Sequence, residues 1–223
     1  MNQKTEFLLG LSCLLPMLYY LFYFNRIDKR YQFLFYLLLT DVAIEILNNT
    51  NTQQFLWIDT FKKCYFNIYL FINFLVFLWL VYKNKYTGKT LIALTVSIAL
   101  AVFIANGLLE KSFNAYFFFF LCYVSSIMLF ISIKILSAQI FETSKSWYKN
   151  FWFLFSSACI LYHSFTVLIF GLFYFSLFDT PNGRSVVYIH HFINVFYYLL
   201  MLWAIYLLPK KPILTLPIKK INV

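Results

Sequence analysis

Residues 186–208 have the sequence VVYIHHFINVFYYLLMLWAIYLL, an apolar run that carries His190, His191 and Asn194. A helix rises about 1.5 Å per residue, so this run is long enough to cross a hydrocarbon core of about 30 Å. Six similar runs precede it, and helices satisfy their own backbone groups in lipid. We therefore predict an all-α bundle of seven transmembrane helices, at residues 7–24, 31–47, 64–82, 91–108, 115–136, 151–177 and 186–208.

The composition indicates the same class. Of the 223 residues, 62% are hydrophobic, 23% are aromatic and 12% are charged, and the mean hydropathy is +0.75. This balance is typical of a protein whose solvent is the lipid bilayer. The net charge of +10 comes from basic residues in short connections, where they act as orientation signals, so we expect no nucleic-acid partner.

The distribution of lysine and arginine predicts the orientation. Of the 18 basic residues, 13 follow the first, third, fifth and seventh runs, and 5 lie on the other side. The positive-inside rule places the richer side in the cytoplasm, so the N-terminus is expected outside and the C-terminus inside. We expect residues 1–208 to form the transmembrane domain and residues 209–223 a basic cytoplasmic tail, with no room for an output domain.

Polar side chains inside the membrane are costly, and ionisable ones are functional candidates by default. Asp41 and Glu45 lie four residues apart, on one face of the second helix, where like charges repel. Glu45 and polar groups of the third and seventh helices lie at a similar depth in the predicted outer half. We therefore predict an outward-facing polar pocket lined by Asp41, Glu45, Asn67, Asn73, His163, His190, His191 and Asn194.

Each of these residues also has a purely structural interpretation. Asparagines in membrane helices commonly bond neighbouring helices, at about 0.6–2 kcal/mol each. His163 fits the description of a packing histidine. His190 and His191 point about 100° apart, so only one of them is expected to face the bundle.

Several activities can be compared with the sequence. The last run contains no lysine, which excludes a retinal Schiff base there. A metal could use the acidic and histidine residues, but no HExxH or ExxH spacing occurs, and we expect no metal or other cofactor. A membrane-embedded hydrolase is one alternative, because Thr40-Asp41 loosely resembles the Gly-Asp of lysoplasmalogenases.

A transporter or a structural subunit of a membrane complex is a further alternative. The seven-helix architecture resembles that of the SWEET sugar transporters, which hinge on prolines in several helices. Here Pro16 is the one proline within a predicted span, so such hinges are poorly provided.

Short motifs along nearly the whole chain resemble one further family. They are the second helix ending at Glu45, Asn67-Ile68-Tyr69, Phe151-Trp152 running on to Tyr162, and His190 or His191 with Asn194. Together they resemble a family of small bacterial seven-helix membrane proteins of unassigned function, whose genes often lie near sensor histidine kinases. Asn73 departs from an acidic residue common in that family.

The resemblance implies a multi-pass protein of the bacterial inner membrane that signals through a partner such as a histidine kinase. Together with the polar pocket, it favours a receptor-like module that senses a ligand or protons over an enzyme. We expect Glu45 and one of His190 or His191 to form the responsive pair.

Overall fold

The computed structural model describes residues 11–49, 56–109, 117–142, 146–174 and 181–208. The structure is 91% helical, and there is no β-strand among these residues. Each of the seven predicted runs corresponds to one helix. The helices are α2 (Leu14–Tyr23), α3 (Phe33–Asn49), α4 (Leu56–Lys83), α5 (Lys89–Leu109), α6 (Phe118–Glu142), α7 (Phe151–Tyr174) and α8 (Pro181–Tyr206). The predicted tail, 209–223, lies outside the described residues.

Five of these helices are long and apolar enough to cross a membrane, and they agree with a multi-pass membrane protein. The candidate spans are Lys63–Lys83, Lys89–Leu108, Phe118–Phe141, Phe151–Leu172 and Ile189–Tyr206. In the described part α2 has 10 residues and α3 has 17, so both are shorter than these spans. That all seven helices cross the bilayer stays a prediction.

Three helix boundaries differ from the predicted ones. Helix α4 begins at Leu56 rather than at residue 64, and α6 continues to Glu142 rather than ending at residue 136. Helix α8 begins at Pro181, five residues before the apolar run. Hydropathy marks the apolar part of a helix, whereas backbone hydrogen bonds continue into polar flanks. Pro181 suits a first helical position because the amide there has no intrahelical partner.

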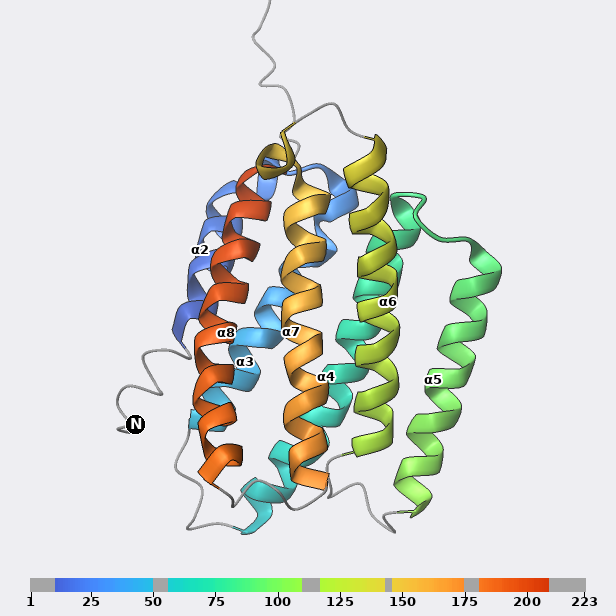
Figure 1. Cartoon of the computed structure of the whole chain (residues 1–223), viewed down its shortest axis with the longest axis vertical. Helices are drawn as coiled ribbons and strands as arrows, with labels where there is room; N and C mark the ends of the chain where they lie inside the picture. The colour runs from blue at the N-terminus through green and yellow to red at the C-terminus, as the bar shows by residue number, and fades with distance from the viewer. Residues whose placement is uncertain (1–10, 50–55, 110–116, 143–145, 175–180, 209–223) are drawn as a thin grey trace, which may run out of the picture.

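Six helices form a closed ring, and α5 lies outside it (Figure 1). Around the ring, α2 packs against α3, α3 against α4, α4 against α6, α6 against α7, α7 against α8, and α8 against α2. Helix α5 packs against α4 and α6 at the edge of the bundle. In the apolar segment of α5, 22% of the residues are buried, compared with 50% in that of α4. Most of α5 therefore faces the surroundings.

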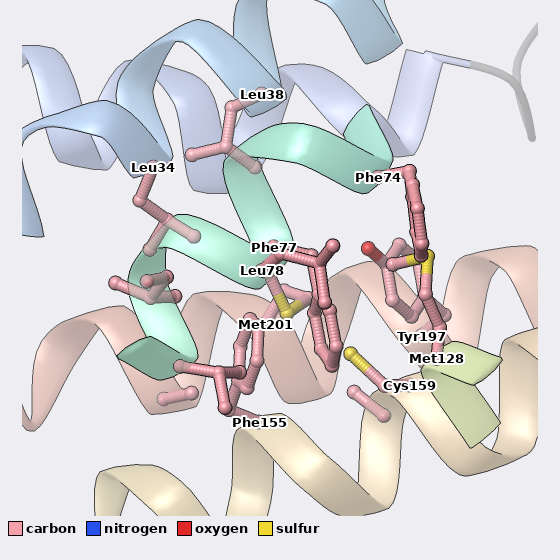
Figure 2. Packing of buried hydrophobic residues seen from close by; sticks show 14 of the residues in the cluster. Leu34, Leu38, Phe74, Phe77, Leu78, Met128, Phe155, Cys159, Tyr197 and Met201 are labelled. Carbon is pink, nitrogen blue, oxygen red and sulfur yellow. The ribbon is translucent and has the colours of Figure 1, made fainter. Parts of the chain in front are cut away.

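The centre of the ring is filled by large apolar side chains (Figure 2). The Phe77 ring of α4 stacks on Phe155 of α7, with centroids 6.1 Å apart. Phe155 also stacks on Phe151 at 5.4 Å. The other cluster residues labelled in the figure are Leu34, Leu38, Phe74, Leu78, Met128, Cys159, Tyr197 and Met201.

The outer surface of the bundle is also apolar. Phe22 of α2 is 84% exposed, and Phe130 and Phe141 of α6 are 67% and 88% exposed. In water so many exposed aromatic rings would favour aggregation, whereas lipid tails solvate them. The aromatic run at the start of α6 divides between core and surroundings, since Phe117 and Phe120 are buried and Phe119 is 49% exposed.

Hydrogen bonds join α6 and α7 at the end of the bundle where their connection lies. The Asn150 side-chain amide donates to Gln139 Oε1 at 2.6 Å, and the Gln139 amide donates to the Tyr86 hydroxyl at 2.9 Å. Asn150 Oδ1 accepts from the Trp152 backbone N–H at 2.9 Å, which caps the first turn of α7. These bonds set the level at which the two helices meet.

Phe155→Ala tests the packing of the ring centre. The substitution removes a ring that is 1% exposed and stacked on two others, so we expect a loss of about 3–5 kcal/mol of unfolding free energy. Phe119→Ala is the matched control, because that ring is 49% exposed. Unfolding in detergent, followed by tryptophan fluorescence, measures both. Equal losses for the two variants would contradict the arrangement.

Candidate functional site

Asp41 lies near the middle of α3 and points into the bundle, with 3% of the residue exposed. Its Oδ1 accepts a hydrogen bond from the Tyr69 hydroxyl at 2.6 Å. The same oxygen accepts from Asn73 Nδ2 at 3.2 Å. Tyr69 and Asn73 lie four residues apart on one face of α4, which is why both reach one carboxyl group.

Thr40 extends this set of bonds. Its Oγ1 lies 3.1 Å from Asn73 Oδ1 and 2.8 Å from the Leu37 carbonyl oxygen. The single hydroxyl proton can be donated to one of these acceptors at a time. The Asn73 amide therefore faces Asp41 with its nitrogen and Thr40 with its oxygen. We call Thr40, Asp41, Tyr69 and Asn73 the Asp41 group.

The Asp41 group is electrically unusual because its carboxyl is held by neutral donors. In the part of the chain that the structure describes, no Lys, Arg or His side chain lies within ion-pair distance of Asp41. By contrast, Asp28 pairs with Arg30 at 3.1 Å in an exposed turn. A carboxyl group buried in an apolar helix and bonded by a hydroxyl and an amide is a candidate for binding a proton or a polar ligand.

A second polar set lies between α7 and α8. The Tyr162 ring is 5.2 Å from the His163 ring and 6.2 Å from the His190 ring, measured between centroids. Among the described residues, His163 Nδ1, His190 Nδ1 and Asn194 Oδ1 are buried without a hydrogen-bond partner. We call Tyr162, His163, His190 and Asn194 the histidine group. Its unpaired atoms can accept or donate to a polar ligand or to water.

Tyrosine rings join the two groups. The Tyr197 ring of α8 lies 4.8 Å from the Tyr162 ring. Tyr69 is close enough to Tyr162 and Tyr197 for their hydroxyls to interact electrostatically, and Tyr197 interacts in the same way with Asp41. The Asp41 group, which includes Tyr69, and the histidine group, which includes Tyr162, therefore adjoin inside the ring.

Asn67 has a different position from the one predicted. Its Oδ1 accepts from the Phe117 backbone N–H at 3.1 Å. Asn106 of α5 similarly accepts from the Phe120 backbone N–H at 2.8 Å. The first N–H groups of a helix have no intrahelical partner, so these two asparagines complete the first turn of α6 from neighbouring helices. The structural interpretation of Asn67 accounts for this bond.

The remaining predicted residues, His191 and Glu45, belong to neither group. His191 is half-buried, and it is His190 whose ring lies against Tyr162. Glu45 falls within α3, but its side chain lies outside the described part of the structure, so its pairing with a histidine stays a prediction. Within the described ranges no three His, Cys, Asp or Glu side chains gather to hold a metal ion.

Four residues of the site were not among the predicted pocket residues: Thr40 and three tyrosines. Each tyrosine lies near a predicted residue in the sequence. Tyr69 shares a helix face with Asn73 and Tyr197 shares one with Asn194, whereas Tyr162 directly precedes His163. Tyrosine is frequent in this chain, with 18 copies, so its presence alone did not single them out. The four-residue spacing of Tyr69 and Asn73 was the available signal.

Comparison with known proteins adds no relative. No family model, no curated protein and no solved structure matches the chain.

Tyr69→Phe tests the bond that holds Asp41. The variant keeps the ring and removes the hydroxyl at 2.6 Å from the carboxyl, so we expect a loss of about 1–3 kcal/mol of unfolding free energy in detergent. Tyr36→Phe serves as the control, since Tyr36 is 51% exposed on the same pair of helices. The placement of Asp41 is wrong if the two substitutions cost the same.

Proposed function

We propose that this multi-pass membrane protein is a receptor-like sensor whose stimulus, a proton or a small polar ligand, acts at Asp41. One observation carries the proposal: a carboxyl group, 3% exposed in the middle of a helix, is bonded by neutral donors alone within the described residues. Ionisable groups are rarely retained inside membrane helices unless they have a function.

The Asp41 group offers a physical basis for a response. An ionised carboxylate accepts hydrogen bonds, and in that form it holds both the Tyr69 hydroxyl and the Asn73 amide. A protonated carboxyl also donates, so protonation changes which bonds between α3 and α4 are favourable. A ligand that bonds the carboxyl has a similar effect. A stimulus that favours one set of bonds shifts the population between two packings of these helices.

The proposed signal passes to a second protein. The described connections are short and the helices themselves carry the polar groups, which supports a route from helix packing to a partner. The resemblance to proteins encoded near sensor histidine kinases suggests a histidine kinase as the kind of partner, and the bacterial inner membrane as the location. The predicted pairing of Glu45 with His190 or His191 belongs to the same proposal.

A structural subunit of a larger membrane assembly is the second candidate. It is supported by the filled centre of the ring, where Phe77 and Phe155 stack (Figure 2). It is also supported by the bond from the Phe117 backbone N–H to Asn67, which has a structural role. Purification in mild detergent distinguishes the two. A structural subunit carries partners in fixed stoichiometry, and its stability does not respond to a stimulus at Asp41.

Asp41→Asn tests the sensor. The amide has nearly the same size but no titratable proton. We expect the tryptophan fluorescence of the reconstituted parent protein to change with pH, and we expect Asp41→Asn to abolish that change. Asp28→Asn is the control, because that carboxylate pairs with Arg30 in an exposed turn. If Asp41→Asn responds as the parent does, Asp41 is not the site of the stimulus.

The proposed orientation has its own test. We place the N-terminus outside and the C-terminus in the cytoplasm, because 13 of the 18 basic residues lie on the latter side. A fluorescent protein that matures in the cytoplasm alone, fused after Val223, is expected to be bright. A fusion placed before Met1 is expected to be dark. The reverse result would place the polar groups in the half of the bilayer opposite to the one proposed.

A further inference from the structure

Hydroxyl groups in the helices fall into two classes. Ser157 Oγ donates to the Phe153 carbonyl at 2.8 Å and Thr166 Oγ1 to the Tyr162 carbonyl at 2.9 Å, so both bond to their own helix. Ser125 and Ser156 are fully buried, and within the described residues their Oγ atoms have no hydrogen-bond partner. The second class therefore needs a different explanation.

Ser125 belongs to α6 and Ser156 to α7, and these two helices pack against each other. The bond from Asn150 to Gln139 fixes their relative level at one end. Further along, the Cys159 thiol of α7 lies beside the Ser132 hydroxyl of α6. Because the helices are antiparallel, a step toward the start of α6 corresponds to a step toward the end of α7 (Figure 1).

This register produces two tiers of polar side chains. Ser132 and Ser156 form the first tier, next to Cys159. Ser125 and His163 form the second, since each lies seven residues further along its helix, a distance of about 10 Å. Seven residues are close to two turns, so both tiers face the same way. We call these four residues the α6–α7 seam.

His163 is the decisive member of the seam. The residue is 6% exposed, and its Nδ1 has no hydrogen-bond partner among the described residues. The His163 Nδ1 and the Ser125 hydroxyl lie at one level of the seam, and neither has a hydrogen-bond partner among the described residues. At least two hydrogen bonds are therefore left to be made. The seam carries no formally charged side chain, so an ion finds no counter-charge there. Water is neutral, donates and accepts, and occupies such sites inside proteins.

We propose that the α6–α7 seam binds water at two sites. The upper site lies at Ser132 and Ser156, and the lower site bridges Ser125 and His163. His163 adjoins the Tyr162 ring at 5.2 Å, so the lower site places water beside the histidine group. This inference does not rest on sensing at Asp41, because the seam and the Asp41 group share no residue. It adds a hydrated polar region that shares His163 with the histidine group.

Ser156→Ala tests the upper site, because the sign of the change in unfolding temperature distinguishes a hydrated seam from a dry one. If Ser156 bonds bound water, the variant loses that bond, and the unfolding temperature in detergent falls by about 2–4 °C. If the seam is dry, the variant removes an unpaired buried hydroxyl, and the unfolding temperature stays the same or rises, which overturns the upper site. Ser157→Ala is the matched control, since its hydroxyl bonds to the Phe153 carbonyl of its own helix.

Solid-state NMR in lipid tests the lower site. In a protein with nitrogen-labelled histidine and with His190→Gln and His191→Gln, only the His163 ring reports. We expect magnetisation to pass from water to that ring, and to fall several-fold when Ser125→Leu fills the space. No transfer in the parent protein, or transfer that Ser125→Leu leaves unchanged, overturns the lower site. Either result leaves the test of Asp41 unaffected.

Discussion

A hydrocarbon core supplies no hydrogen-bond partners, so each polar atom within these helices depends on another part of the chain. The constraint explains why Asn67 and Asn106 reach across to the first backbone N–H groups of α6. It explains why the Ser157 and Thr166 hydroxyls donate to carbonyl oxygens of their own helix, those of Phe153 and Tyr162. The same constraint makes the neutral donors around Asp41 informative, because a carboxyl group is the most costly of these groups to bury.

The apolar packing and the polar site are complementary parts of one interior. Stacked rings at Phe77 and Phe155 keep α4 and α7 in contact through the centre of the ring. Polar side chains then meet where the tyrosines of α4, α7 and α8 adjoin. Tyrosine suits this boundary, because its ring packs with the phenylalanines while its hydroxyl bonds Asp41. The site is therefore supported by the core rather than separated from it.

Much of the fold could be predicted from the sequence, because apolar runs of about 20 residues have one solution in lipid. Helix ends were less predictable: polar flanks such as those of α4 and α8 continue a helix without a hydropathy signal. Of the site, Asp41, Asn73, His163 and His190 were predictable as costly groups. Which of them meet depends on helix rotation and on which helices are neighbours, and neither follows from one sequence.

Asn67 shows the limit most clearly, since its depth matched that of the pocket residues but its face did not. The side chain turns toward the start of α6 and accepts a backbone N–H there. In the same way, the aromatic run at residues 117–120 could be divided between core and lipid only in outline. The rotation of α6 about its own axis decides that Phe117 and Phe120, rather than Phe119, are buried.

The position of α5 outside the ring has a consequence for how the protein is assembled. Helices α4 and α5 precede α6 in the chain, and each supplies one asparagine acceptor for the first turn of α6. During synthesis both acceptors are in the membrane before α6 leaves the ribosome. Helix α5 thus offers α6 a surface to pack against, and α7 and α8 then close the ring by packing against α6 and α2.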